Sequence, residues 1–433
     1  METRRKKTRI VTYTLTVLVL LSFSTLLVIA ASSGIVRTAA PAATLTSASV
    51  MTTPILDGDF TDPAWAEATS ITIDTAGGSG SISITVKSVY TDTDLFFLVQ
   101  WNDPTMSMTR SGSWNWNGTS WETTESSQSE DRVAFLWNIN MSEFYSTGAM
   151  AKCHPQYGGS GAFLETPGET GDIWHMKAAR SLGIISASQS KPINVDSETH
   201  EVTTGTITMN GYMDDKYLSY EDPADLPEDG GRHGDSGSST YGRNRNADKT
   251  GPLYLETEPA DYIDAMILKQ SEIDGGETLE VATATTEQIT DAWNKYAQLG
   301  AVVSERILRA PSGSRGDLMQ SATWSDGTWT TEIKRALVTK TDEVINTDDV
   351  QFSDLTATYG FSVSVMDNAG GDEHSSTGTT VYDLAFGEAV SETTSETVSE
   401  TISELTGFNV MLLLFALGGI ILLVAVNRRR RKD

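Results

Sequence analysis

The stretch Tyr90 to Asp103 reads YTDTDLFFLVQWND, and its centre, Leu95 to Trp101, is a short apolar and aromatic run between turn residues. Side chains of this kind favour extended chain, whereas Asp, Asn, Gly and Ser favour turns. Four other runs share these properties: Ser81 to Val86 (SISITV), Arg132 to Trp137 (RVAFLW), Thr204 to Met209 (TGTITM) and Phe361 to Met366 (FSVSVM). Short strands bounded by turns indicate an all-β fold, an antiparallel β-sandwich with few short helices, more than a βαβ fold.

The helical signal in this region is confined to Glu287 to Leu299. Thr286 is the candidate N-cap of that helix and Gly300 its candidate stop. The segment Glu221 to Thr250 is rich in Gly, Asp and Ser and has no periodic pattern. We expect it to be a long surface excursion, and loops of this length are candidates to cover a site.

The first 31 residues have the features of a signal peptide or a signal anchor. Five cations between Arg4 and Arg9 precede an apolar stretch from Ile10 to Ala31. Its length suffices to span a bilayer, while the small residues at its end would permit cleavage. Both interpretations stay open at this point.

The C-terminus carries the stronger membrane signal. Phe408 to Val426 contains no charged residue, and five cations follow between Arg428 and Lys432. This pattern predicts a transmembrane helix over 407–427 and a basic cytoplasmic tail over 428–433. Because cations stay on the cytoplasmic side, we expect both tails inside the cell and everything between them outside.

The composition of the chain between the two predicted hydrophobic helices indicates a spacer, a large domain and a stalk. Residues 32–53 are rich in Ala, Ser and Thr and are predicted to be a spacer. Residues 387–406 include the repeat SETTSETVSETISE and are predicted to be a stalk. The large extracytoplasmic domain is therefore expected over 54–386.

Charge and cysteine content restrict the partners and the source of stability. The formal net charge is -27, and the terminal cations make the intervening region more acidic still, which argues against nucleic acid as a partner. Cys153 is the one cysteine in 433 residues. The exported domain must therefore be stabilised by its core without internal disulfides.

Two strings carry a resemblance to known sandwiches. Ile55 to Ala68 (ILDGDFTDPAWAEA) places an Asp-Gly turn before a Trp, and Tyr90 to Asp103 is a predicted strand that ends at an Asp. Together they resemble the opening of the carbohydrate-binding family 9 and DOMON-like sandwiches, in which the Trp is buried. The resemblance implies a carbohydrate-binding family 9-like β-sandwich and by itself says nothing of function.

Four further strings narrow the resemblance. They are Asp131 to His154, which ends GAMAKCH, Gly171 to Arg180 (GDIWHMKAAR), Ser314 to Leu337, and Val350 to His374, which ends VMDNAGGDEH. In order, they resemble the haem-binding domain of the ethylbenzene dehydrogenase gamma-subunit and dimethyl sulfide dehydrogenase type, over nearly all of Pro54 to Phe386. That family implies a sandwich that holds one b-type haem and exchanges electrons with the iron-sulfur subunit of a molybdenum enzyme.

The resemblance also bears on how the haem is held. Relatives read Gly, Cys, three residues, Cys, His where this sequence has Gly148 to His154, with Ala149 in the place of the first Cys and Cys153 as the second. A pair of thioether links is therefore excluded. We expect a haem b that is bound without covalent links.

Axial ligation needs a soft or nitrogen donor on each face of the porphyrin. The family is similar in using Met with Lys, and Met150 is our first choice because it lies in the matching string beside His154. His175 is the preferred second donor, with Lys177 and Lys249 as alternatives. The expected ligands of the haem iron are therefore Met150 and His175.

The same residues also have structural interpretations. His175 could donate to a backbone carbonyl, and Lys177 could pair with Asp172, without any cofactor. His154 could ligate the iron, bind a propionate or cap a turn. On a strand, His175 and Lys177 would point to one face and Met176 to the other.

Two haem-free hypotheses stay open. A binding module on the same sandwich could stack surface aromatics such as Trp114, Trp116 and Trp121 on sugars. A surface-structural protein would account for the stalk, the anchor and the acidity. In the haem hypothesis, Arg180, Arg232 and Arg335 could neutralise the propionates, whereas the ordinary expectation for an Arg is an exposed position on the surface.

The sequence offers little for catalysis of its own. It has no Gly-rich phosphate loop, no Ser nucleophile elbow and no His-Glu-x-x-His string. We therefore expect an electron-transfer or binding subunit. Its expected partners are the membrane and a molybdopterin enzyme or iron-sulfur subunit.

Overall fold

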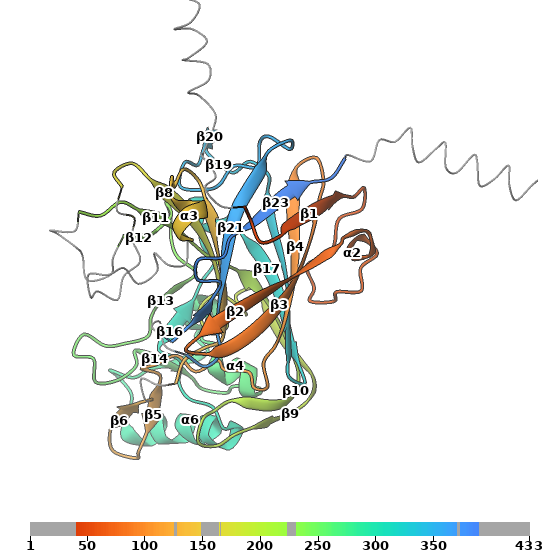
Figure 1. Cartoon of the computed structure of the whole chain (residues 1–433). Helices are drawn as coiled ribbons and strands as arrows, with labels where there is room; N and C mark the ends of the chain where they lie inside the picture. The colour runs from red at the N-terminus through yellow and green to blue at the C-terminus, as the bar shows by residue number, and fades with distance from the viewer. Residues whose placement is uncertain are drawn as a thin grey trace, which may run out of the picture.

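The computed structural model describes residues 40–124, 128–148, 164, 166–222, 231–369 and 373–388. Most strands of this part join one large sheet, in the order β12-β11-β8-β7-β21-β22-β2-β3-β4-β18-β17-β10-β9 (Figure 1). Their bounds are β2 Ser70–Gly77, β3 Gly80–Tyr90, β4 Asp94–Asn102, β7 Arg132–Asn138, β8 Thr170–Lys177, β9 Ser186–Val195, β10 Val202–Tyr212, β11 Asp214–Ser219, β12 Arg232–Gly234, β17 Met319–Ser325, β18 Thr328–Ala336, β21 Thr358–Met366 and β22 Ser375–Ser376. The predicted all-β fold is confirmed.

The sheet folds back on itself, so that distant strands face each other across a core. The Phe97 ring on β4 lies 5.7 Å from the Trp174 ring on β8 and 5.8 Å from the Trp137 ring on β7, between ring centroids. Those strands are not neighbours in the sheet order. Two layers with an aromatic interior are the arrangement of a β-sandwich.

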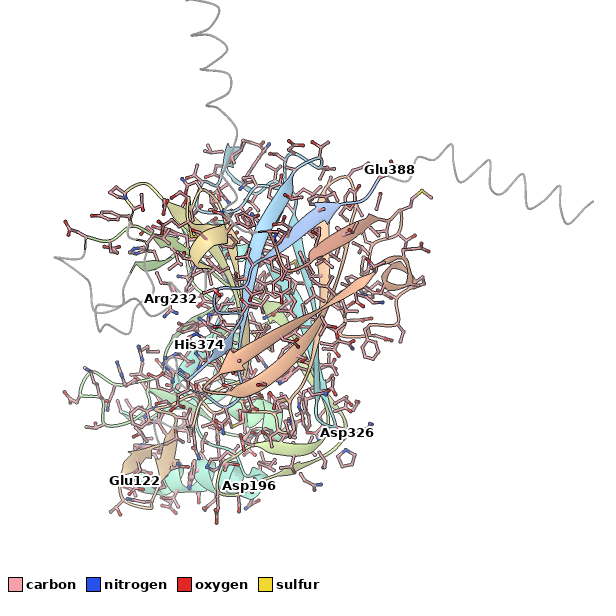
Figure 2. The ribbon with its side chains drawn as sticks, viewed as in Figure 1. Glu122, Asp196, Arg232, Asp326, His374 and Glu388 are labelled. Atoms are coloured by element: carbon pink, nitrogen blue, oxygen red, sulfur yellow. The ribbon has the colours of Figure 1, made fainter. Side chains whose placement is uncertain are left out.

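A first strand closes the edge between the two layers. β1 (Thr44–Ser49) pairs in parallel with β23 (Tyr382–Phe386) and with β3. Leu45 on β1 is fully buried in the core. The spacer predicted over 32–53 is therefore wrong for this stretch, because its alternating side chains pack like those of any other strand. Glu388, which ends the described chain, lies beyond β23 (Figure 2).

The five strand predictions are confirmed, because the quoted runs fall within β3, β4, β7, β10 and β21. The predicted helix is also present, as α6 (Thr286–Leu299). Its N-cap is Thr285 and not Thr286: the Thr285 side chain accepts from the Gln288 amide while the Gln288 side chain accepts from the Thr285 amide. Gly300 ends the helix in the left-handed conformation, as predicted.

Several small elements complete the described chain. Most lie beside α6 or at the sheet ends (Figure 1). Their bounds are α2 Ala64–Glu67, α3 Phe144–Thr147, α4 Tyr262–Met266, α5 Gln270–Gly275, β5 Trp114–Trp116, β6 Trp121–Thr123, β13 Tyr241–Arg243, β14 Tyr254–Glu256, β15 Thr278–Glu280, β16 Arg306–Leu308, β19 Lys340–Thr341, β20 Val344–Ile345 and the 3-10 turn η2 Gly313–Gly316.

The surface excursion predicted over Glu221 to Thr250 is wrong for much of its length. β12 pairs with β11, and β13 pairs with β16. Asn244 is fully buried, and its side-chain amide donates to the carbonyl oxygens of Tyr254 and Ser304. Polar composition suggested a loop, but these backbone and amide groups are hydrogen-bonded inside the domain.

The predicted Asp-Gly turn and buried Trp are both present. Trp65 is 2% exposed and its Nε1 donates to Oε1 of Glu332 at 2.9 Å. Oε2 of the same carboxyl accepts from the Gly58 amide at 3.0 Å. Gly58 has φ +80, and a Cβ there would lie 2.4 Å from Oγ1 of Thr323, so the turn requires glycine.

In the described part of the chain, no helix is long and apolar enough to cross a membrane. The predicted signal segment Ile10 to Ala31, the stalk repeat and the apolar segment Phe408 to Val426 lie outside the described residues.

Candidate functional site

β8 is buried on both of its faces. Because side chains alternate along a strand, the two predicted donors on β8, His175 and Lys177, lie on the same face. Trp174 and Met176 point into the sandwich core. Ile173, His175 and Lys177 therefore share the opposite face, as predicted for the last two. We call the surface that carries them on β7, β8 and β11 the outer face.

His175 lies in the middle of the outer face. It is 4% exposed, and it sits opposite Ala134 on β7 and Asp214 on β11. Its Nε2 is buried and has no hydrogen-bond partner among the described residues. Burial, followed by the positive charges of Lys177 and Arg132, holds the His175 pKa well below its usual value. The imidazole is therefore neutral at neutral pH, which is the form that ligates metals.

An apolar cluster occupies the outer face on the Ile173 side of His175. Short helix α3 and Leu164 cover it, and the Leu164 amide donates to the carbonyl oxygen of Ser219 at 2.9 Å. Its members are Leu136, Met141, Phe144, Tyr145, Leu164, Ile173, Leu218 and Val381. Such a buried cluster provides apolar neighbours for the flat body of a porphyrin.

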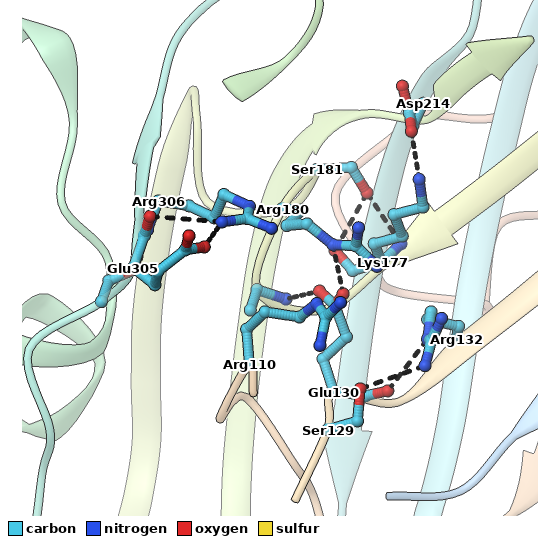
Figure 3. A network of polar contacts seen from close by, with 12 residues as sticks. Arg110, Ser129, Glu130, Arg132, Lys177, Arg180, Ser181, Asp214, Glu305 and Arg306 are labelled. Carbon is cyan, nitrogen blue, oxygen red and sulfur yellow. Dashed lines mark hydrogen bonds and ion pairs between the residues drawn. The ribbon is translucent and has the colours of Figure 1, made fainter. Parts of the chain in front are cut away.

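A cationic network occupies the outer face on the Lys177 side (Figure 3). Lys177 forms a short ion pair with Asp214, and Arg180 forms another with Glu130. Oε2 of Glu130 also accepts from the Ala179 amide at 2.8 Å. Burial would raise the Glu130 pKa, but Arg180 and neighbouring cations outweigh it and hold that pKa below its usual value.

Tyr241 on β13 is the aromatic centre of this network. The Arg306 guanidinium lies 5.3 Å, the Arg180 guanidinium 5.6 Å and the Lys177 Nζ 5.9 Å from its ring centroid. Burial would raise the Tyr241 pKa, but Arg180 and the other cations bring it below its usual value. Cations gathered on one ring in this way favour a negative charge nearby.

These features match the three parts of a haem. The buried, unpartnered Nε2 of His175 is a candidate iron ligand, the apolar cluster suits the porphyrin, and the cations suit propionates. The described residues therefore fit the group.

The structure places His175 and Lys177 on one face of β8 and Lys249 far from them. His175 and Lys177 lie together on the outer face, but Lys177 pairs with Asp214 and not with Asp172, because Asp172 points to the other face of β8. Lys249 is exposed in the turn that starts at Asn246. Gly251, two residues after Lys249, packs against Trp121 of β6, which lies at the opposite end of the molecule from the top of β8 (Figure 1).

Other predictions lie outside the described residues or need correction. Met150, Cys153 and His154 lie outside the described residues. Of the candidate propionate partners, Arg180 is in the cationic network and Arg232 is exposed on edge strand β12.

Arg335 is not a surface residue of the outer face. It is fully buried in the sandwich interior, where its guanidinium lies 5.2 Å from the Trp174 ring centroid. It is therefore unavailable to a propionate on the outer face.

The aromatic residues proposed to stack on sugars are mostly packed together. Trp114 is 2% exposed, so the prediction of a surface ring is wrong for it. Trp116 and Trp121 are half-buried, with ring centroids 5.1 Å apart, and Trp121 also contacts Trp293 of α6. No flat, free aromatic platform is formed by these three described residues.

Sequence reasoning missed several residues of the site. Met141 brings a thioether into the apolar cluster, and Glu130, Arg132 and Tyr241 build the cationic network. Met141 follows a predicted strand, but a lone Met carries no signal of its own. The others are adjacent only in the folded chain.

A family model described as ethylbenzene dehydrogenase matches residues 62–377. No curated protein matches the chain significantly. Among solved structures, a carbohydrate binding module family 9 from Caldicellulosiruptor kristjanssonii in complex with cellotriose aligns at 8% identity and TM-score 0.28, covering 80% of this chain and 95% of that one. The same module in complex with glucose aligns at 9% identity and TM-score 0.28, covering 81% and 97%.

Proposed function

The chain belongs to the ethylbenzene dehydrogenase family, and on this premise we propose that it is an extracytoplasmic electron-transfer subunit that binds one haem b. The observation that carries the proposal is the buried Nε2 of His175, which has no partner among the described residues. An imidazole nitrogen left unpaired in a protein interior costs free energy unless a ligand uses it. When bound, haem would supply one-electron redox chemistry.

The chain's own residues would hold and tune the group. His175 would ligate the iron, and the apolar cluster around Ile173 would exclude water from the porphyrin. Arg180 and Lys177 would lie on the propionate side, where they already balance Glu130 and Asp214. Burial of an axial ligand and the charges around it are the means by which a protein sets a haem potential.

The second axial ligand is proposed to be Met150. It follows Gly148, at which α3 ends beside the apolar cluster, by two residues. Met141 is the alternative thioether, because it already belongs to that cluster. With a single cysteine in the chain, the attachment is proposed to be non-covalent.

The proposed location rests on the two terminal segments, and the proposed partner rests on the family. We propose that two apolar segments, each next to cations, hold the domain at the outer face of the cytoplasmic membrane. They are Ile10 to Ala31 and Phe408 to Val426. The proposed redox partner is a molybdopterin oxidoreductase, through its iron-sulfur subunit. The chain itself is proposed to carry electrons without turning over a substrate.

The test is the absorption spectrum of the full-length protein expressed with haem available, oxidised and dithionite-reduced. We expect a Soret band with sharp low-spin α and β bands. His175→Ala should lose the low-spin bands, whereas the control His233→Gln, on edge strand β12, should keep them. Met150→Ala and Met141→Ala distinguish the two thioethers.

Each outcome is decisive for one part of the proposal. A featureless spectrum from folded wild-type protein overturns haem binding. A low-spin spectrum that His175→Ala leaves unchanged overturns the ligand assignment while keeping the cofactor.

A further inference from the structure

Four aspartates meet at the inner face of β8 and β11, on the side opposite His175. Asp172 and Asp215 come from these strands, and Asp349 and Asp235 from segments that follow β20 and β12. One carboxylate oxygen from each of Asp172, Asp215 and Asp349 lies within 4.8 Å of the others. All four residues are at most 3% exposed. We call them the inner aspartates.

Six oxygens of the inner aspartates are buried without a hydrogen-bond donor among the described residues. They are Oδ1 of Asp172, Oδ1 of Asp349 and both oxygens of Asp215 and of Asp235. The carboxyls of Asp215 and Asp235 interact: the charge of Asp235 raises the Asp215 pKa, so a proton or a cation near them is favoured.

The other two oxygens are held in place. Oδ2 of Asp172 accepts from Nε1 of Trp174 at 2.9 Å and from the Val350 amide at 3.0 Å. Oδ2 of Asp349 accepts from Oγ1 of Thr339 at 2.6 Å. Anchoring one oxygen of a carboxylate leaves the other fixed and free, as outer-shell hydrogen bonds do for metal ligands.

The positive charge that the described residues bring to this group is far too small. Arg335 lies 3.6 Å from Oδ2 of Asp172 and 3.8 Å from Oδ2 of Asp349, between nitrogen and oxygen atoms. One guanidinium cannot balance four buried carboxylates, and uncompensated buried charge costs several kcal/mol per ion. Burial, together with the neighbouring carboxylates, raises the pKa of Asp172 to about 8 and that of Asp235 to about 9.

We propose that the inner aspartates form a binding site for a hard divalent cation, Ca²⁺. Ca²⁺ takes six to eight oxygen ligands from carboxylates and tolerates irregular geometry. Zn²⁺ prefers nitrogen and sulfur, and Mg²⁺ prefers a smaller octahedral shell with several waters. A site of four buried carboxylates and no imidazole or thiol matches Ca²⁺ best.

A cavity lies next to the segments that carry two of the inner aspartates. Its volume is about 580 Å³, and its lining includes Ser236 and Asp348, each adjacent in sequence to an inner aspartate. Tyr217 of β11 and Thr170 of β8 line it as well. The cavity therefore borders the segments that carry Asp235 and Asp349, and the side chains of these two aspartates lie behind its lining.

The proposed ion would act as a structural clip. It would join β8 and β11 to the segments around Asp235 and Asp349, just beneath the strand that carries His175 on its other face. This role does not depend on haem, and its test needs none.

A second acidic group offers the matched control. Asp103, Asp131 and Asp367 also have carboxylate oxygens within 4.8 Å of one another. Both oxygens of Asp131 are hydrogen-bonded, Oδ2 to the Ser107 amide at 2.7 Å and Oδ1 to the Asn368 amide at 3.0 Å. Fewer of its oxygens are free, so we do not assign a cation to this group.

The first experiment is equilibrium dialysis of full-length, EGTA-treated protein against ⁴⁵CaCl₂. We expect about one Ca²⁺ per chain, loss of this binding in Asp215→Asn, and retention in Asp367→Asn. Tb³⁺ can replace Ca²⁺, and its emission should be sensitised by Trp174, which donates to Asp172. Absent binding, binding that survives Asp215→Asn, or binding that Asp367→Asn alone abolishes would overturn the proposal. Equal binding of MgCl₂ would overturn the assignment to Ca²⁺.

Thermal unfolding gives an independent readout that the wild-type protein can supply alone. CaCl₂ should raise its midpoint by about 5 °C over EGTA. Asp215→Asn should be more stable than wild type in EGTA, because Asn is neutral in this buried position without having to take up a proton, and it should not respond to CaCl₂. A wild-type midpoint that is the same in CaCl₂ and EGTA would show that protons alone neutralise these carboxyls, and it would overturn the proposal.

Discussion

Asp214 and Asp215 are adjacent on β11 and fully buried, yet they lie in opposite electrostatic environments. Asp214 points to the outer face, where Lys177, Lys216 and Arg315 surround it, and these cations outweigh burial and hold its pKa below the usual value. Asp215 points to the inner face, where burial and then Asp235 and Asp172 raise its pKa well above that value.

The difference shows that burial alone does not decide the state of an aspartate. A strand sends neighbouring side chains to opposite faces, so each carboxylate meets a separate set of partners. On the outer face, cations from β8 and the 3-10 turn η2 (Arg315) complete ion pairs. On the inner face, the strongest interactions of Asp215 are with other aspartates, and the opposing effect of Arg335 is smaller.

The largest effect is expected from Asp214→Asn. It leaves the Lys177 ammonium buried without its ion-pair partner, and breaking one side of a buried pair costs about 3–5 kcal/mol. We expect a loss of that size in the free energy of unfolding, measured by urea denaturation at pH 7. Asp215→Asn, one residue away, should instead increase that free energy in EGTA.

Lys191→Ala is the surface control for this pair of variants. Lys191 pairs with Asp326 at 2.9 Å, but both side chains are more than half exposed, and Asp326 lies at the periphery of the molecule (Figure 2). Loss of this ion pair should change the free energy of unfolding by less than about 1 kcal/mol. If Asp214→Asn cost no more than this control, the contrast between the two faces would be wrong.

A smaller effect is expected from a buried acid that has hydrogen-bond donors but no cation. Glu332 accepts from Trp65, Gly58 and Asp57, yet burial still raises its pKa to about 7. An acid with a raised folded pKa stabilises the fold at low pH, and that stability is lost as pH rises through the folded pKa. Between pH 5 and pH 8, the free energy of unfolding of the wild-type protein should therefore fall by about 2 kcal/mol more than that of Glu332→Gln.

The measurement is urea denaturation of both proteins at the two pH values, so that other titrating groups cancel in the difference. Asp354→Asn serves as the exposed control, because Asp354 titrates at the surface and should not change the pH dependence between these values. Equal slopes for wild type and Glu332→Gln would show that the three donors keep Glu332 ionised throughout.

The fold was predictable because its strands carry their own signals. Leu95 to Trp101 alternates poorly but is apolar, short and bounded by turn residues, and it lies in β4. The shared face of His175 and Lys177 followed from strand alternation alone. The same rule excludes Asp172 as the partner of Lys177, because the two residues are an odd number of positions apart, five, and so point to opposite faces of the strand.

The partners in both sites were not predictable, because they come from distant segments. Asp214 is 37 residues from Lys177 in the sequence. Asp235 and Asp349 lie in connections without periodic pattern, and nothing in the sequence indicates that they meet Asp172. Buried charges depend on tertiary contacts, which local pattern does not encode.

The smallest effect is expected from Tyr241→Phe. The ring face that Arg180, Arg306 and Lys177 approach is retained in Phe, so most of the cation–π attraction stays and the loss should be below about 1 kcal/mol. Tyr241→Ala, which removes the ring, should cost clearly more in the same urea titration. If Phe were as damaging as Ala, the hydroxyl would be the essential part, and the lowered Tyr241 pKa would indicate that the cations interact with a phenolate. The outer face would then hold a third anion beside Asp214 and Glu130, and it would be less positive toward a propionate than its cations suggest.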